Sequence, residues 1–145
     1  MKLSAKTEYA AIASLELARR VDSPSPVRIR DICAAQGVPS RFLVHILLLL
    51  KAAGIVVSVR GAAGGYRLAR DAESVSLLDI RNAVEGPEGT VATVSAELAD
   101  TSRTATVLAV AWDTASAAES EYLAGITLAA LAARCGRPSD PMYYI

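Results

Sequence analysis

The sequence predicts a mainly α-helical fold that carries one small β-hairpin. We count 28 alanines in 145 residues, with an aromatic content of only 5%, and this composition favours closely packed helices over a large sheet. Hydrophobic residues make up 52% of the chain and charged residues 21%, which is unlike a disordered protein. The length fits one domain of ordinary size and makes a multidomain enzyme unexpected.

The N-terminal part is expected to contain a helix followed by a helix-turn-helix. Ser4 is a candidate N-cap for a first helix that runs to about Arg20. A short second helix is predicted over residues 27–35, where Gln36-Gly37 stops it, and Pro39 can begin a third helix over residues 39–53. Two short helices joined by a glycine-containing turn are typical of a helix-turn-helix.

The third helix has two unequal faces. Helical spacing predicts that one face turns inward, with Phe42, Leu43, Ile46, Leu47 and Leu50. The opposite face is unusually apolar for an exposed surface, and it holds Arg41, Val44, His45 and Leu48.

A hairpin is expected after Gly54. Residues 55–59 and 66–69 read as strands, and a glycine-rich loop joins them. The loop does not match a phosphate-binding loop, because it lacks the GxGxxG and GK[ST] patterns and leads into a strand. A hairpin after a helix-turn-helix is a winged helix, and we interpret the loop as a wing against DNA, a bare structural turn being the alternative. Its candidate residues are Arg60, Gly61, Gly64, Gly65 and Arg67.

The C-terminal part is predicted to contain three further helices. Ser76 and Asp79 have the spacing of a capping box that opens a helix to about Glu85. Residues 86–101 are expected to form a loop. An alanine-rich helix is predicted over residues 102–123, with apolar residues at i, i+3 and i+4 spacing that form one face and need a packing partner. A last helix is predicted over residues 126–134.

The zero net charge conceals a strong asymmetry. Residues 1–86 hold 12 basic and 8 acidic side chains, a net +4, whereas residues 87–145 hold 3 and 7, a net −4. Residues 28–70 contain seven basic side chains and one acidic side chain, Asp31, which gives this stretch a net charge of +6. This stretch is the expected site of contact with phosphate.

Several classes of function are excluded or disfavoured. Cys33 and Cys135 lie 102 positions apart without CxxC spacing, so neither a disulfide framework nor a zinc site is indicated, and a reducing cytosol is the simpler setting. His45 is the only histidine, and no acid, base and nucleophile constellation surrounds it, so no enzyme is expected. Neither a signal peptide nor an apolar run long enough for a membrane is found, which predicts a cytoplasmic protein without membrane contact.

Seven segments together carry a family resemblance. They are MKLSAKTEYA (1–10), RDI (30–32), QGVPSRFL (36–43), LKAAGI (50–55), SVRGAAGGY (58–66), DIRNAVE (79–85) and YLAGITL (122–128). In this order and spacing the chain resembles the Rrf-two family of bacterial transcription regulators, winged helix-turn-helix proteins with a long C-terminal dimerisation helix. The SVRGAAGGY segment is the most specific of them.

The resemblance implies a DNA interface. Ser40, Arg41, Val44 and His45 would lie at the start of the recognition helix and Arg60 at the wing. A helix N-terminus in the major groove reads base edges, and an arginine on a hairpin can enter a narrow minor groove. Phosphate contacts are expected from Lys6, Arg28, Arg30, Arg41, Lys51 and Arg67.

The resemblance also implies a homodimer. A winged-helix domain over residues 1–86 would be followed by a loop over 87–101 and by the dimerisation helix and tail over 102–145. Expected interface residues are Val107, Leu108, Ala111, Trp112, Ala115, Tyr122 and Leu123. Such a dimer would bind a roughly palindromic operator in double-stranded DNA.

The chain departs from the family in the segment that carries the sensor. Iron–sulfur members hold their cluster through cysteines, commonly three, between the fourth helix and the dimer helix. Residues 86–111 contain neither Cys nor His, and Glu8 alone does not make a site. We therefore expect no cofactor and no metal, as in the cluster-free branch of the family, whose control depends on a regulatory protein partner.

The sequence thus predicts a homodimeric DNA-binding repressor. One alternative is a winged helix that serves as a protein-interaction module, which the apolar Val44, Leu48 and Leu49 would favour. Another is a redox or metal sensor that uses Cys33 or Cys135 with non-standard ligands such as Glu8.

Overall fold

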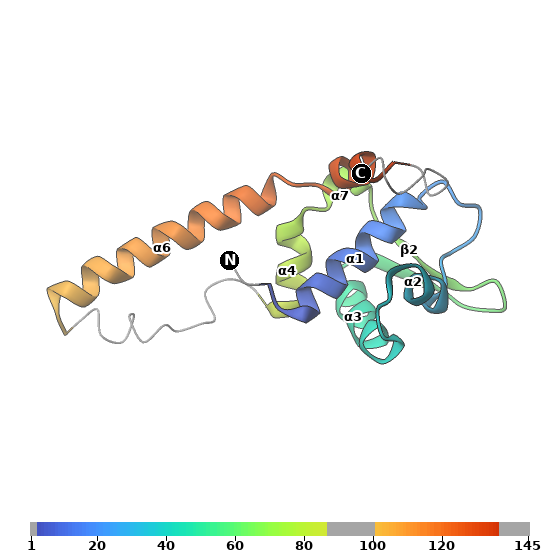
Figure 1. Ribbon diagram of the computed structural model, residues 1–145, viewed down its shortest axis with the longest axis horizontal. Coiled ribbons are helices and arrows are strands. Elements are labelled where there is room, and N and C mark those ends of the chain that lie inside the picture. The colour runs from blue at the N-terminus through green and yellow to red at the C-terminus, as the bar shows by residue number, and fades with distance from the viewer. Residues whose placement is uncertain (1–2, 87–100, 137–145) are drawn as a thin grey trace.

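The computed structural model describes residues 3–86 and 101–136 and confirms a mainly helical winged helix with a long C-terminal helix (Figure 1). The elements follow the predicted order, and a short 3-10 helix, η1, is added before the fourth helix. They are α1 (Ala5–Arg19), α2 (Ile29–Gln36), α3 (Ser40–Ala52), β1 (Val56–Val59), β2 (Gly65–Leu68), η1 (Ala72–Ser74), α4 (Leu77–Glu85), α6 (Arg103–Ala124) and α7 (Leu128–Cys135). The loop expected over residues 86–101 falls almost wholly outside the described residues.

Local signals in the sequence set the helix ends. Ser4 caps α1 by accepting a hydrogen bond from the backbone N–H of Thr7 at 3.1 Å. Ser76 and Asp79 form the predicted reciprocal capping box at the start of α4. Gly37 ends α2 in the left-handed region, with φ of 68° that suits glycine, and so turns the chain into α3.

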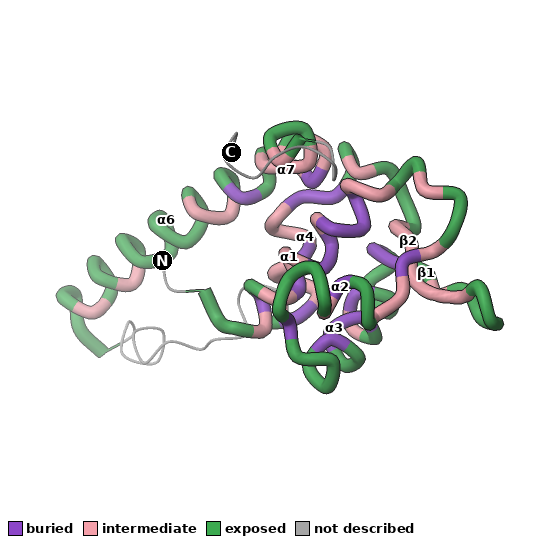
Figure 2. Tube along the Cα trace, turned by 45° about the vertical axis from the view of Figure 1, so that its right-hand side comes forward, coloured by how far each residue is buried: buried purple, intermediate pink, exposed green. Residues whose placement is uncertain are grey.

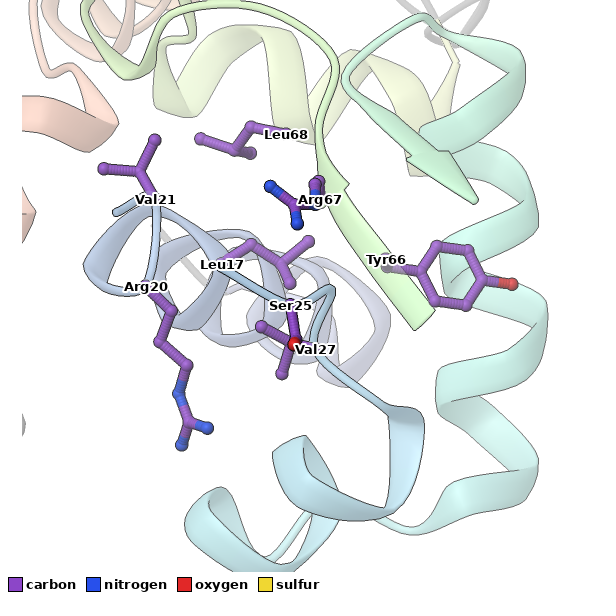
Figure 3. A pocket seen from close by; sticks show the side chains of 8 residues that line it. All are labelled: Leu17, Arg20, Val21, Ser25, Val27, Tyr66, Arg67 and Leu68. Carbon is purple, nitrogen blue, oxygen red and sulfur yellow. The ribbon is translucent and has the colours of Figure 1, made fainter. Parts of the chain in front are cut away.

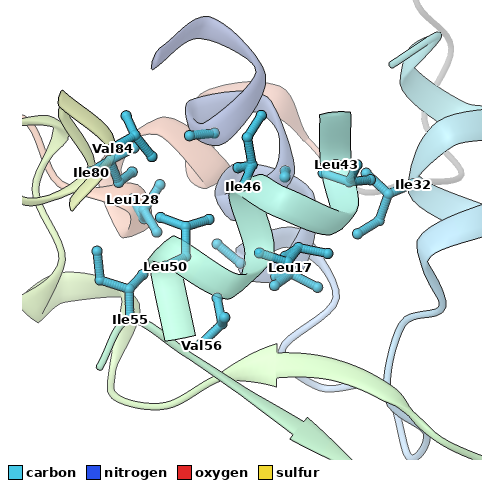
Figure 4. Packing of buried hydrophobic residues seen from close by; sticks show 14 of the residues in the cluster. Leu17, Ile32, Leu43, Ile46, Leu50, Ile55, Val56, Ile80, Val84 and Leu128 are labelled. Atoms are coloured by element: carbon cyan, nitrogen blue, oxygen red, sulfur yellow. The ribbon is translucent and has the colours of Figure 1, made fainter. Parts of the chain in front are cut away.

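The hydrophobic core is built around α1, which packs against α3, α4 and α7 (Figure 4). Leu17 of α1 belongs to a cluster of buried side chains from these elements, and the largest of them are almost fully removed from solvent. They include Ile32, Leu43, Ile46, Leu47, Leu50, Ile55, Ile80 and Leu128. The positions of α3 that do not point into this core remain at least partly exposed and can contact a partner.

The hairpin is anchored to the loop between α1 and α2. β1 pairs antiparallel with β2, and Ser58 lies opposite Tyr66. Val27 exchanges two backbone hydrogen bonds with Tyr66, of 2.9 and 2.8 Å. The prediction that the second helix begins at residue 27 is wrong, because Val27 is extended and adds a third backbone segment to the hairpin.

The C-terminal helices play two different roles. α6 extends away from the helices around α1, whereas α7 returns to them (Figures 1 and 2). Backbone hydrogen bonds join Leu77 N to Ile126 O and Leu128 N to Val75 O, both 2.9 Å, and Leu128 is fully buried in the core. α7 therefore contributes to the core of the winged helix.

Membrane-spanning segments were sought among the described helices. None of them alone has the length and hydropathy to cross a bilayer, and α2 with α3 would reach these values only as a pair bent by 120°.

Candidate nucleic-acid interface

The exposed face of α3 gathers the side chains predicted to read bases. Leu43, Ile46, Leu47 and Leu50 are buried, so helical geometry turns the intervening positions to solvent. Ser40, Arg41, Val44 and His45 are all exposed over the first two turns of this helix. This face offers a hydroxyl, a guanidinium, an imidazole and an aliphatic side chain within one short stretch.

Phe42 does not lie in the core, contrary to the prediction. Its side chain is 45% exposed, whereas Leu43 in the same turn is fully buried. Phe42 lies about 100° around the helix from Leu43, which places it at the margin of the buried face. The ring centroid is 6.1 Å from that of Tyr9, and the Arg41 guanidinium carbon lies 4.7 Å from the Phe42 centroid. A cation–π contact of this kind holds Arg41 near the helix N-terminus.

Different physical constraints favour glycine at the three glycine positions of the hairpin loop. A Cβ at Gly64 would lie 2.3 Å from the carbonyl oxygen of Val59, and one at Gly65 would lie 2.5 Å from that of Val27. Both positions therefore need glycine for the hairpin's own packing. Gly61 has open space around it and a φ of 108°, so only its backbone conformation favours glycine.

Basic side chains link the hairpin to the helices beside it. Arg28 donates from Nη2 to the Ala62 carbonyl oxygen at 2.6 Å, and Lys51 Nζ donates to Ser58 Oγ at 2.7 Å. Arg60 is exposed at the hairpin end and makes no hydrogen bond or ion pair with the part of the chain that the structure describes. Arg60 is thus available to an external partner, while Arg28 helps to hold the loop.

The remaining predicted phosphate contacts are placed in three different ways. Arg30 is exposed on α2, 4.0 Å from the Asp31 carboxylate. Lys6 lines an apolar groove of about 390 Å³ beside Tyr9, Phe42 and His45. Arg67 is half-buried behind the hairpin, where Nη2 donates to the Pro24 carbonyl oxygen at 2.7 Å. This contact favours a role for Arg67 inside the protomer.

A buried carboxylate joins α1 to α2, and sequence reasoning missed this role. Glu16 is only 3% exposed. Its oxygens accept from Arg20 Nε at 2.6 Å, Arg19 Nη1 at 3.4 Å and Gln36 Nε2 at 2.9 Å. The sequence offers one signal of this role, because arginines follow the glutamate by three and four positions on a helix, a spacing that allows ion pairs.

A second carboxylate joins the start of α1 to the end of α4. Glu85 accepts hydrogen bonds from the hydroxyls of Ser4 and Thr7, the latter at 2.7 Å. These hydrogen bonds, that of Ser4 first, lower the pKa of Glu85 from its ordinary value of 4.5, and the charge of Lys6 acts in the same direction. Lys6 therefore lies on a part of α1 whose position α4 fixes.

The long helix α6 presents an apolar face to solvent. Of the seven residues predicted at a dimer interface, Val107, Leu108, Ala111, Trp112, Ala115 and Tyr122 are exposed, Trp112 by 58%. Leu123 is different, because it is 6% exposed within the protomer and has little surface left for a partner. Leu123 follows Glu119 by one turn of α6, and Glu119 forms an ion pair with Arg81 of α4 at 3.1 Å.

The donor atoms of the chain do not fit an iron–sulfur cluster. Within residues 3–86 and 101–136, no cluster of three or more His, Cys, Asp or Glu side chains is arranged to hold a metal ion. Cys33 is half-buried against the core, as its apolar neighbours predict, and Cys135 is a half-buried free thiol at the end of α7. Fe–S clusters are bound mainly by Cys thiolates, and the whole sequence has only these two.

Comparison with known proteins points to one family. The family model described as "Rrf2: Iron-dependent Transcriptional regulator" matches residues 3–134. The HTH-type transcriptional regulator Rv1287 of Mycobacterium tuberculosis is 37% identical over 132 residues, which cover 91% of this chain and 81% of that protein. An rrf2-like regulator of Rhodobacter capsulatus is 44% identical over 87 residues, 59% of this chain and 58% of the relative. The match to IscR of Vibrio vulnificus, at 41% identity, spans 59% of this chain and half the length of that relative.

Solved structures agree with this assignment. T. potens IscR has a TM-score of 0.74 and 30% identity, covering 100% of this chain and 97% of that one. CymR of B. subtilis, described as the global cysteine regulator, has a TM-score of 0.66 and 26% identity, covering 92% and 97% of the two chains. With the family match over nearly its whole length and a winged helix like theirs, the chain belongs to the Rrf2 (Rrf-two) family of transcriptional regulators.

Proposed function

We propose that the protein is a homodimeric transcriptional repressor that binds a roughly palindromic operator in double-stranded DNA. The observation that carries this proposal is the exposed N-terminal face of α3, with Ser40, Arg41, Val44 and His45. Beside it, the hairpin exposes Arg60, which has no hydrogen bond or ion pair among the described residues. The net +4 of residues 1–86 supplies the attraction to phosphate, and the net −4 of residues 87–145 keeps the rest of the chain away from DNA.

Each part of the surface has a separate task in this proposal. The start of α3 enters the major groove, where Ser40 and His45 donate to or accept from base edges and Val44 contacts a thymine methyl group. Arg60 enters the minor groove, where a narrow groove attracts a guanidinium. Lys6, Arg30, Arg41 and Lys51 contact phosphates and set affinity without reading sequence.

The dimer in this proposal forms through α6. The exposed residues of its apolar face, Trp112 among them, are covered by the same helix of a second copy. A two-fold dimer places its two recognition helices on half-sites about 34 Å apart, one turn of DNA.

Regulation in this proposal does not use an iron–sulfur cluster. The support is the donor set, because two cysteines and one histidine in the whole chain are too few for the usual ligands. Control then passes through a regulatory protein partner, in the cytoplasm, where the free thiols of Cys33 and Cys135 stay reduced.

Binding to random-sequence duplex tests the DNA-binding part of the proposal. We expect the full-length protein to retain labelled duplex at low salt, and the logarithm of the binding constant to fall linearly with that of the salt concentration. Fluorescence anisotropy measures both. A protein that retains no duplex even at low salt contradicts the proposal.

The exposed apolar side chains of α3 favour a second candidate, a protein-interaction module. Phe42 and Val44 are both 45% exposed and Leu48 is 54% exposed, more apolar surface than DNA reading needs. Failure to bind duplex, together with capture of a defined protein partner that Leu48→Lys abolishes, would favour this candidate over the first.

A further inference from the structure

A pocket lies behind the hairpin, on the side away from the solvent-facing residues of α3. It has a volume of about 170 Å³ and is walled by the C-terminal end of α1, the loop that follows, and β2 (Figure 3). The residues that line it are Leu17, Arg20, Val21, Ser25, Val27, Tyr66, Arg67 and Leu68. None of the tasks assigned above uses this space.

The lining is mixed: Leu17, Val27 and Leu68 supply apolar surface beside polar groups, and Arg67 directs a positive group inward (Figure 3). The Arg67 guanidinium lies between the side chains of Leu68 and Leu17, whereas that of Arg20 points away and the Tyr66 ring lies on the other side of β2 (Figure 3). Arg20 is held by Glu16 at 2.6 Å. No Asp or Glu lines the pocket. A guanidinium beside these aliphatic side chains, with no acidic residue in the lining, is complementary to an anion that carries a short hydrocarbon part.

Arg67 has donors to spare for such an anion. A guanidinium has five N–H donors in a rigid fork that matches a carboxylate, and in Arg67 a single Nη2 contact, to the Pro24 carbonyl oxygen, is recorded. The hydroxyl of Ser25 is part of the same lining. Carboxylate recognition therefore needs no new polar group in the pocket.

The volume limits the size of the ligand. A volume of about 170 Å³ admits only a small molecule. Pockets for drug-sized ligands are larger, about 300 Å³ or more. A carboxylate with three or four carbons fills the space.

We propose that this pocket binds a short aliphatic carboxylate, with its carboxylate on Arg67 and its hydrocarbon part against Leu17, Val27 and Leu68. The site itself does not depend on the proposed DNA binding. Its effect on operator affinity does depend on the proposed DNA binding. The pocket joins α1 to β2, and β2 leads back through the glycine loop to Arg60. A bound acid therefore stiffens the attachment of the wing. Allosteric couplings are typically about 5- to 150-fold in affinity, and we expect operator affinity to change within this range.

The binding test uses isobutyrate and the full-length protein without DNA. We expect saturable chemical-shift changes in amide NMR spectra at Val21, Val27 and Leu68, and none with isobutyramide, which has the same shape without the charge. Arg67→Gln should abolish the changes. The matched control is Arg70→Gln, which removes a nearby exposed guanidinium that pairs with Asp79 at 3.7 Å and does not line the pocket.

A second variant covers the possibility that Arg67→Gln disturbs folding. Val21 is 59% exposed at the rim, so Val21→Phe narrows the pocket without changing the core, and it should weaken isobutyrate binding at least tenfold. Equal binding of isobutyramide, shifts centred on Lys6 and Tyr9 instead, or no saturable shifts in the wild-type protein overturns the proposal. Because no DNA is present, failure of operator binding leaves these outcomes unaffected.

Discussion

Arg60 and Gly64 belong to the same hairpin loop, but charge matters at Arg60 and steric fit matters at Gly64. Arg60 is exposed and has no recorded partner within the described residues, so its charge is available to DNA. Gly64 is fixed by the protein itself, because a side chain there would meet the Val59 carbonyl. The motif that resembles the family therefore combines one residue for recognition with others for the shape of the loop.

Replacement of Arg60 tests the recognition role. Arg60→Ala should weaken binding to a specific operator by about 1–3 kcal/mol, the usual cost of losing one specific contact, with little change in thermal stability. Gel-shift titration against the selected operator measures the effect. The matched control, Arg134→Ala, removes an exposed arginine of α7; equal losses for both variants would mean that only overall charge matters.

Replacement of Gly64 tests the structural role. A Cβ 2.3 Å from a backbone oxygen forces the loop to shift, so Gly64→Ala should lower the free energy of unfolding by about 1–3 kcal/mol. Urea denaturation followed by circular dichroism gives this value. Ala63→Ser changes an exposed neighbour and should be neutral, and a Gly64→Ala protein as stable as wild type would show that the loop tolerates the side chain.

Sequence reasoning at the residue scale succeeds where one local rule decides. Ser4 and the Ser76–Asp79 box are caps whose spacing alone specifies the hydrogen bonds. It fails for Phe42, which lies at the margin of the buried face and is 45% exposed, whereas Leu43 in the same turn is fully buried. It cannot predict the contact of Arg67 with Pro24, which joins positions 43 residues apart in sequence.

At the scale of elements, two carboxylates add polar contacts to the apolar packing between α1 and its neighbours. Glu16 ties the end of α1 to α2, and Glu85 ties the end of α4 to the start of α1. Helix positions and the hairpin follow from periodicity and glycine placement, but η1 and the pairing of Val27 with Tyr66 do not, because they depend on contacts made only after the chain has folded.

The Glu85 contact predicts a dependence of stability on pH. Its folded-state pKa lies below 4.5, so the ionised form contributes stability above the unfolded-state pKa, and this stability is lost as pH falls through the lower, folded value. Because the carboxylate is exposed, the contribution should be below about 1 kcal/mol. Unfolding free energies from pH 7 down to 3 should fall less steeply for Glu85→Gln than for wild type.

One control variant separates this contact from a general effect of charge. Glu73→Gln removes an exposed carboxylate of η1 and should reproduce the wild-type profile. Should Glu85→Gln and wild type have parallel profiles, the hydrogen bonds from Ser4 and Thr7 do not stabilise the ionised carboxylate.

At the scale of the whole molecule, the charge asymmetry and the exposed face of α6 acquire a common explanation. The acidic C-terminal half carries the helix that we propose to be the dimer interface, and the basic half carries the proposed reading surface. α7 departs from this division, since its Leu128 lies in the core of the winged helix.

A charged residue on the apolar face of α6 should break the proposed dimer. Trp112→Lys is expected to give monomers in sedimentation equilibrium and at least tenfold weaker operator binding, since a monomer contacts one half-site. Asp113 is exposed on the opposite side of α6, so Asp113→Lys should stay dimeric. A Trp112→Lys protein that remains dimeric would place the interface elsewhere.

Selection of bound sites from a random DNA library, carried out with the purified full-length protein, tests the central claim of sequence-specific operator binding most directly. We predict enrichment of a roughly palindromic motif with half-sites about one helical turn apart. We also predict that Val44→Ala and His45→Ala alter the enriched bases, since those side chains face the groove. A library that returns no enriched motif after several rounds would contradict the account.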